Sequence, residues 1–380
     1  MSLAGPHQGV GGRISNLDLL RGIAVLGILI MNAVSYGLPD AAYFNLRAGG
    51  TTSSFDWAIG WFDEVFVDQK MMGLFSMLFG ASIVLFADRA NANDRNGTLL
   101  SVWRNVLLLG IGLLHSLLWD GDVLTVYALC APVLLLARRW KPRTLIVAGT
   151  GLMAATVVAA ALAQASVPAD GAGLRGFWTN SGPPMSDAVG LFLIIDFFGR
   201  ALGMMLLGVA SYRLGVIQGH RSPALYRCLV AVGFGVGIPL AALGVALQAA
   251  HRYSPTVAVI GEVPNTVATI PMTVGYLGLI TRWNQRPDSA LRRRIRAAGR
   301  MALTNYLSQT VIGIVVLRHA FPFASLSRWQ IAVFVAVIWV LELAWSQPWL
   351  ARFQYGPVEW AWRSATYLRL MPLRRVPESD

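Results

Sequence analysis

Residues 17–37 read LDLLRGIAVLGILIMNAVSYG, an apolar run long enough to cross a lipid bilayer as a single helix. The hydrocarbon core of a membrane is about 30 Å thick, which takes roughly 20 helical residues. Asp18 and Arg21 lie three positions apart at the start of the run, and Asn32 follows eleven positions after Arg21. At about 100° per residue, Asn32 returns to nearly the same side of the helix as Arg21. The stretch therefore predicts a membrane-spanning helix with one polar stripe.

The composition extends this interpretation to the whole chain. Hydrophobic residues make up 55% of the 380 residues, charged residues only 13%, and the mean hydropathy is +0.55. A soluble domain carries about 25% charged residues. We therefore expect an all-α, polytopic transmembrane helix bundle that is held in the lipid bilayer. The apolar runs predict about ten spans, near 17–37, 65–87, 104–120, 122–138, 144–165, 188–212, 225–249, 264–282, 301–318 and 329–347.

The positions of Lys and Arg predict the orientation of these spans. Most of the 31 basic residues fall in connecting segments that are cytosolic if the N-terminus is cytosolic. With ten spans, both termini are then expected in the cytosol. The net charge of +12 does not indicate a nucleic-acid partner, because the charges lie in short segments between apolar runs. The Trp-rich, amphipathic segment 55–64, FDWAIGWFDE, is expected in the outer membrane interface before the second span.

The strongest run of positive charge separates the last two spans from the others. Residues 283–300 read WNQRPDSALRRRIRAAGR, most simply a topology signal. We expect an N-terminal bundle over residues 1–290 and a C-terminal two-helix region with a basic cytosolic tail over residues 291–380. The two cysteines indicate neither a disulfide framework nor a metal site, and no metal is expected.

The stretch HSLLWDGD at 115–122 holds the candidate catalytic residues. His115 is eleven residues beyond Arg104, which marks the cytosolic end of its span, so it is expected near the middle of the membrane. Asp120 and Asp122 flank a glycine at the next turn, where they could serve turn and capping roles. A histidine with a carboxylate nearby is also the usual arrangement of a general base. Either aspartate could orient His115, or the stretch could hold one hydrogen-bonded histidine and a turn.

Further ionisable residues within spans are costly in hydrocarbon and are therefore candidates for a polar cavity. Asp196 and Arg200, spaced i,i+4, are expected to form a salt bridge, and Asp18 and Arg21 could form another or could anchor an anionic donor. The set assigned to a substrate cavity is Asn32, Asp68, Lys70, Asp196, Arg200 and Glu342.

Several stretches together resemble a known family. RISNLDLLRGIAVLGILIMN, DQKMMGLFSMLFG and GLLHSLLWDGDVLTVYALC, followed by GRMALTNYLSQ and FQYGPVEWAWRSATY, resemble the YeiB-like family of bacterial inner-membrane proteins, whose C-terminal domain has no assigned function. The resemblance covers roughly residues 13–367. It implies a multi-pass protein of the bacterial inner membrane. The start LDLLRG also resembles the opening motif of a broader superfamily of transmembrane acyltransferases that includes lysosomal heparan glucosaminide acetyltransferase.

That relation implies acyl transfer from cytosolic acyl-CoA to a hydroxyl or amine of a small molecule or glycan. Asp18 and Arg21 are then expected to meet the donor, and His115 to deprotonate the acceptor with help from Asp120 or Asp122. The lysosomal enzyme places its catalytic histidine before the second span, whereas this chain has no histidine between His7 and His115. A transporter or flippase for a small polar or lipid-linked substrate is the alternative. The sequence leaves the oligomeric state open, a homo-oligomer included.

Overall fold

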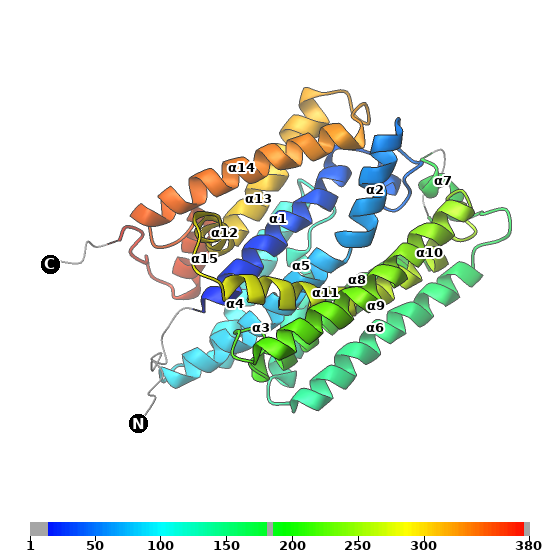
Figure 1. The fold of residues 1–380 in the computed structure, drawn as a ribbon. Coiled ribbons are helices and arrows are strands. Elements are labelled where there is room, and N and C mark those ends of the chain that lie inside the picture. Colours follow the sequence, from blue (N-terminus) through cyan, green and yellow to red (C-terminus); the bar gives the residue numbers. More distant parts are fainter. Residues whose placement is uncertain (1–13, 181–184, 376–380) are drawn as a thin grey trace.

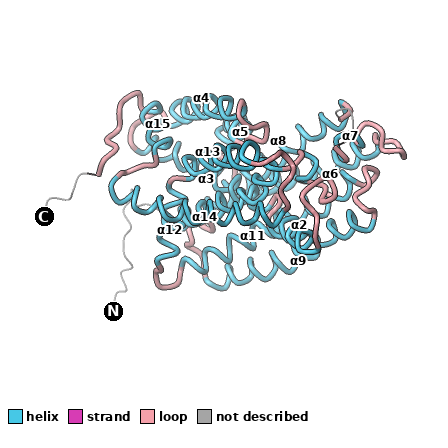
Figure 2. The backbone as a smooth tube through the Cα atoms, turned by 90° about the horizontal axis from the view of Figure 1, so that it is seen from above, coloured by secondary structure: helices cyan, strands magenta, loops and turns pink. Residues whose placement is uncertain are grey.

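The computed structural model describes residues 14–180 and 185–375, and the described chain is built almost entirely of helices (Figures 1 and 2). Short connections separate most of them. The long helices are α1 (Ser15–Gly37), α3 (Lys70–Ala92), α4 (Gly97–Ser116), α5 (Leu124–Ala137), α6 (Pro142–Ala165), α8 (Asp187–Arg213), α9 (Pro223–Ala250), α11 (Val263–Asn284) and α14 (Arg328–Arg352). The shorter helices are η1 (Asp40–Tyr43), α2 (Ser54–Phe66), α7 (Arg175–Trp178), α10 (Ala258–Gly261), α12 (Ala290–Arg300), α13 (Ala302–Gly313), the π-helix η2 (Ile314–Ala320) and α15 (Pro357–Thr366).

The structure confirms the predicted fold class. Within the described ranges, eight helical segments are long and apolar enough to cross a membrane. They coincide with eight of the ten predicted spans. The other two predicted spans, 122–138 and 301–318, fall on α5 with 14 residues and on α13 continued by η2. The protein is therefore an all-α, multi-pass membrane protein.

The first helix lies at the centre of the bundle rather than at its edge. Its neighbours are α3, α11, α12, α13 and α14, and most of its residues are buried. Two glycines bring α1 and α12 into backbone contact. A Cβ atom on Gly299 would lie 2.0 Å from the carbonyl oxygen of Asp18, and one on Gly22 would lie 2.2 Å from that of Ile295. Small residues allow this close approach between membrane helices.

The basic run at 292–296 has a structural role in addition to its charge. It belongs to α12, a helix that begins at Ala290 and packs on α1 and α14. Arg292 is buried, and its guanidinium donates to the carbonyl oxygen of Arg286 at 2.9 Å and to that of Trp283. The predicted division at residues 290 and 291 stays a prediction. Residues on both sides of it pack in one bundle.

The second predicted span is interrupted. Residues 55–64 form most of α2, which packs between α9 and α14, and α3 begins at Lys70 after a break over residues 67–69. At the break Gln69 has φ +62°, a backbone conformation uncommon for residues other than glycine. At the other end of α2, Ser53 and Asp56 form a capping box that fixes the start of that helix. The break places polar residues inside the bundle.

Helix α15, which lies more than 50 residues later in the sequence, provides a capping residue for the start of α13. The Glu359 carboxylate accepts hydrogen bonds from the backbone N–H groups of Leu303 at 2.7 Å and Thr304 at 3.1 Å. These are N–H groups at the start of a helix, which have no partner within the helix. Burial raises the pKa of Glu359, while these hydrogen bonds lower it. Glu359 therefore joins the end of the chain to the bundle.

The orientation of the bundle gives a direct experimental prediction. Figure 1 shows the start of α1 and the end of α14 at the same end of the bundle, and α12 contacts both helices. Reporter fusions after Arg143 and Arg221 are expected to be cytosolic, and fusions near Gly49 and Gly171 external, because basic residues concentrate in the former segments. The measurement is the activity of a compartment-specific reporter at each site. A cytosolic signal at Gly171 contradicts this orientation.

Candidate functional site

A cavity of about 860 Å³ lies among the connections at one end of the bundle. Its wall comes from the second half of α1, the α2–α3 break, the α4–α5 turn, and parts of α6, α8, α10 and α11. Apolar and aromatic side chains form most of the wall. The connections that contribute to it belong to the side predicted to be external. Six predicted site residues line the cavity: Asn32, Asp68, Asp120, Asp122, Asp196 and Arg200.

His115 and Asp122 form a buried pair beside this cavity. Nδ1 of His115 lies 2.8 Å from Oδ1 of Asp122, and both side chains are almost fully buried. Because a carboxylate accepts hydrogen bonds, the pair places the imidazole proton on Nδ1 and leaves the lone pair of Nε2 free. Nε2 is buried and has no hydrogen-bond partner among the described residues. A neutral imidazole in this tautomer can accept a proton at Nε2.

Local sequence explains why Asp122 reaches His115. Helix α4 ends at Ser116, and the turn over residues 117–123 leads back to α5. The second carboxylate oxygen of Asp122 accepts from the backbone N–H of Thr125 at 2.9 Å and from its hydroxyl at 3.0 Å. Gly112 of α4 makes room, since a Cβ there would lie 2.9 Å from that oxygen. Asp122 thus fulfils both roles considered from the sequence, as helix cap and as partner of His115.

His115 itself is not among the residues that line the cavity. Its ring packs against Trp119 and Tyr306, with centroid distances of 6.2 and 5.2 Å, and both of these residues line it. Asp120 lines the cavity and is exposed, but no bond joins it to His115 in the described chain. The structure therefore selects Asp122 over Asp120 as the residue that orients the histidine.

The remaining predicted cavity residues divide into two groups. Arg200 and Asp196 line the cavity and form the expected i,i+4 salt bridge at 2.5 Å. Lys70 and Glu342, by contrast, are fully buried and do not contribute to the described wall. Nζ of Lys70 donates to the backbone oxygen of Glu64 and to the side chain of Asn265. Glu342 accepts from Gln309 at 3.1 Å between α13 and α14. Their assignment to the cavity wall is corrected accordingly, because each is held by protein partners instead.

Asp18 and Arg21 lie at the other end of α1 from Asn32. Arg21 forms an ion pair with Asp18 at 3.5 Å and donates to the hydroxyl of Ser82 at 3.2 Å. Neither residue lines the cavity described above. The local ion pair considered from the sequence is therefore present, and Arg21 remains partly exposed.

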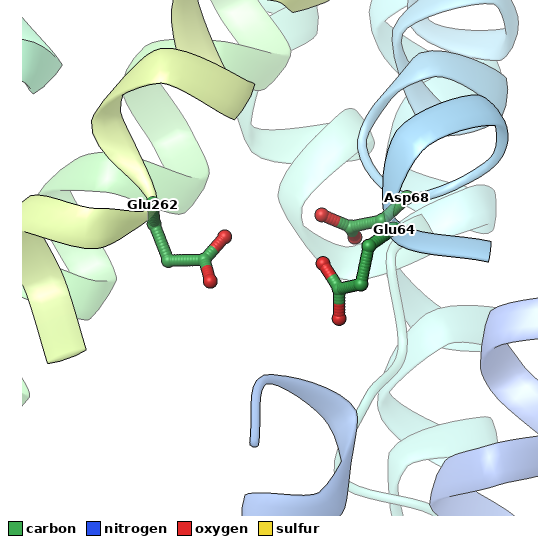
Figure 3. Close-up of side chains that lie close together, drawn as sticks. All are labelled: Glu64, Asp68 and Glu262. Atoms are coloured by element: carbon green, nitrogen blue, oxygen red, sulfur yellow. The ribbon is translucent and has the colours of Figure 1, made fainter. Parts of the chain in front are cut away.

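Three carboxylates near the α2–α3 break form a group that residue spacing does not predict. Glu64 and Asp68 from the break region face Glu262, at the α10–α11 junction (Figure 3). One carboxylate oxygen of each lies within 4.8 Å of the others. Glu64 belongs to the segment 55–64 expected in the membrane interface, and Glu262 lies just before the predicted span 264–282. The only local signal is an acidic residue followed closely by Pro264 between two apolar runs.

Hydrogen bonds fix two members of this carboxylate cluster, which consists of Glu64, Asp68 and Glu262. Asn265 donates to Asp68 at 2.8 Å, and Gln248 donates to Glu262 at 3.4 Å.

Tyr43 from η1 also lines the cavity. Burial, with a smaller contribution from the charge of Asp68, raises the pKa of Tyr43 well above its usual range. Tyr43 is therefore a neutral phenol at any physiological pH.

Comparison with known proteins identifies related chains. Residues 211–369 match the family model described as a protein of unknown function, DUF418. The chain is 32% identical to the uncharacterized protein YeiB of Escherichia coli strain K12, over 92% of this chain and 95% of that protein. It is 29% identical to the uncharacterized protein YxaH of Bacillus subtilis strain 168, over 96% of each. It is 28% identical to an uncharacterized 39.9 kDa protein of Bacillus acidopullulyticus, over 97% of this chain and 98% of that protein.

Proposed function

We propose that this chain, which belongs to the YeiB-like family, is an integral membrane acyltransferase. The observation that carries the proposal is the buried His115–Asp122 pair beside a cavity of about 860 Å³. A buried imidazole bonded at Nδ1 to a carboxylate, with Nε2 unbonded, is suited to general base catalysis. The relatives named above are themselves uncharacterized, so the proposal depends on this site.

In the proposed reaction the acceptor is a hydroxyl or amine of a small molecule or glycan that enters the cavity. Nε2 of His115 takes the proton of the acceptor as its oxygen or nitrogen attacks the acyl carbonyl carbon. The carbon–sulfur bond of the acyl-CoA thioester breaks, and the proton passes from His115 to the departing thiolate. Asp122 keeps the imidazole in the required tautomer and stabilises the imidazolium that forms. Such a base contributes about 10²–10⁴-fold in rate.

We further propose that the acyl donor approaches from the cytosolic side, where Arg21 is expected. The guanidinium of Arg21 is partly exposed and matches the phosphates of coenzyme A, which accept charged hydrogen bonds from arginine. The location fits a bacterial inner membrane, with the acceptor cavity on the external side. This arrangement separates donor entry from acceptor entry along α1.

Arg21→Ala is therefore expected to weaken binding of acyl-CoA by about 1.5–3 kcal/mol, the contribution of a hydrogen bond to a charged group. The measurement is the dissociation constant of acyl-CoA for the purified chain in nanodiscs. Asp18→Asn is the matched variant, because it breaks the Asp18–Arg21 ion pair but leaves the guanidinium for the donor. Wild-type affinity in Arg21→Ala contradicts a donor role, and the ion pair is then a structural contact.

One observation favours transport of a small polar or lipid-linked substrate as a second candidate. A break over residues 67–69 separates α2 from α3 inside the bundle, next to buried charged residues. Discontinuous membrane helices of this kind form the substrate sites of many transporters. Transport through such a site does not require the buried His115–Asp122 pair. We therefore place transport second to acyl transfer.

The experiment that tests the proposed function compares cells with and without the protein. Lipid and metabolite profiling is expected to reveal an acylated product that appears only with the protein. The purified chain in nanodiscs is then expected to form the same product from acyl-CoA. If the same compound instead crosses the membrane of proteoliposomes without modification, the transport candidate is supported and acyl transfer is rejected.

A further inference from the structure

We propose that Glu64, Asp68 and Glu262 form a binding site for a hard divalent cation, separate from the His115–Asp122 pair. Their carboxylate oxygens come within 4.8 Å of one another, and Figure 3 shows the three groups pointing toward a common space. Carboxylate oxygens are the ligands preferred by Mg²⁺, Ca²⁺ and Mn²⁺. The inference concerns binding alone and does not depend on the proposed acyl transfer.

Glu64 supplies an observation beyond the acidic cluster itself. The residue is only 8% exposed, yet no hydrogen bond to its carboxylate and no ion pair is present in the described part of the chain. Its backbone oxygen, by contrast, accepts from Nζ of Lys70. Burying an ionised carboxylate without a partner costs several kcal/mol. A buried, unbonded carboxylate that faces two others is explained by a cation between them.

The charge balance leads to the same conclusion. The charge of Lys70 acts on Glu64 and Glu262, but its Nζ donates to the Glu64 backbone oxygen and to Asn265, and no ion pair joins it to the cluster in the described chain. Arg200 is already paired with Asp196. Three carboxylates and one ammonium sum to a formal charge of −2. The charge of Arg328 also acts on Glu64, but it is shared with Asp63, and the guanidinium donates to the hydroxyl of Thr51 and the backbone oxygen of Ala42. A divalent cation neutralises the negative charge of the cluster and Lys70, whereas a monovalent cation leaves half of it.

The cluster is also accessible to a cation. Asp68 and Glu262 both line the cavity of about 860 Å³, so an ion in the cavity can contact them. Water molecules in the cavity can complete the coordination shell, as they commonly do around Mg²⁺. Asn265 and Gln248, which donate to Asp68 and Glu262, fix the direction of these carboxylates. Groups that orient metal ligands in this way raise metal affinity.

Manganese is the probe for the test, because free Mn²⁺ is counted directly by its electron paramagnetic resonance signal. The full-length chain in nanodiscs is stripped with a chelator, exchanged into metal-free buffer, and titrated without any acyl donor. We expect one saturable Mn²⁺ per chain. Glu64→Gln in α2 and Glu262→Gln at the α10–α11 junction are each expected to weaken binding by at least about tenfold, since even groups that only orient a ligand contribute that much.

Asp40→Asn is the matched control. Asp40 is a carboxylate that lines the same cavity but lies outside the cluster, so its loss changes the charge of the cavity equally. Wild-type affinity is expected in this variant. Thermal unfolding at a fixed Mn²⁺ concentration provides a second measurement. The cation is expected to raise the melting temperature of the wild type and of Asp40→Asn by more than that of either Gln variant, because stabilisation falls as the dissociation constant rises. Absence of Mn²⁺ binding by the wild type, or equal binding by all four chains, overturns the proposal.

Discussion

Replacing His115 with alanine is expected to lower the rate of acyl transfer by about 10²–10⁴-fold, the usual contribution of a general base. The change removes the imidazole that takes the proton from the attacking hydroxyl or amine. It also leaves the carboxylate of Asp122 without its imidazole partner, although Thr125 still donates to it twice. The measurement is transfer from labelled acyl-CoA by the purified chain in nanodiscs, with the fold checked by thermal melting.

Two further variants separate catalysis by His115 from a structural role. His115→Gln retains hydrogen bonding but cannot take up a proton, so it is expected to remain as inactive as His115→Ala. Asp122→Asn keeps the shape and removes the charge, so an intermediate rate is expected. If His115→Ala transfers acyl groups at the wild-type rate, the base assignment is wrong. The stretch then consists of turn chemistry and one hydrogen-bonded histidine.

The largest effect on stability is expected from Gly299→Ala, where α12 touches α1. The added methyl group would lie 2.0 Å from the carbonyl oxygen of Asp18 and 2.6 Å from the backbone nitrogen of Gly22. Both contacts are with backbone atoms, which cannot rotate away as a side chain can. The helices must separate, and overpacking of this kind costs about 1–3 kcal/mol. The measurement is the free energy of unfolding in detergent.

Gly110→Ala is the matched control for that prediction. Gly110 also lies within a helix, α4, but no atom lies within 4 Å of the position that its Cβ would occupy. Alanine is favoured over glycine in helices by roughly 0.5–1 kcal/mol, so this variant is expected to be as stable as the wild type or slightly more stable. Equal unfolding free energies for the two variants would show that α1 and α12 do not pack as closely as described.

The sequence predicts the helices of this protein well because span length and hydrophobicity are local properties. All ten predicted spans fall on helices, and the i,i+4 spacing of Asp196 and Arg200 correctly predicts their ion pair. The proximity of His115 and Asp122 is also partly local, since they are seven residues apart. Which aspartate bonds the histidine depends on how the turn folds back over Gly112, and residue spacing does not determine that.

The rest of the site depends on contacts between distant segments. Glu64 and Glu262 come together only because α2 and α10 are packed in the same bundle, and no periodicity links them. The cost of burying charge correctly marks Lys70 and Glu342 as unusual. That cost does not distinguish a residue facing a cavity from one bonded inside the protein, and the structure places both of these in the interior.

The central position of α1 has a consequence for synthesis on the ribosome. This helix is made first, yet α12, α13 and α14, which cover much of it, are made last. The side-chain amide of Asn16, near the start of α1, donates to the backbone oxygen of Ile217 and to the hydroxyl of Thr281, and both of these residues are made much later. While the middle of the protein is being translated, α1 must wait in the membrane with these surfaces facing lipid or an insertion factor. Nascent chains that stop before α12 are thus expected to be substrates for membrane quality control, even though most of their spans are complete.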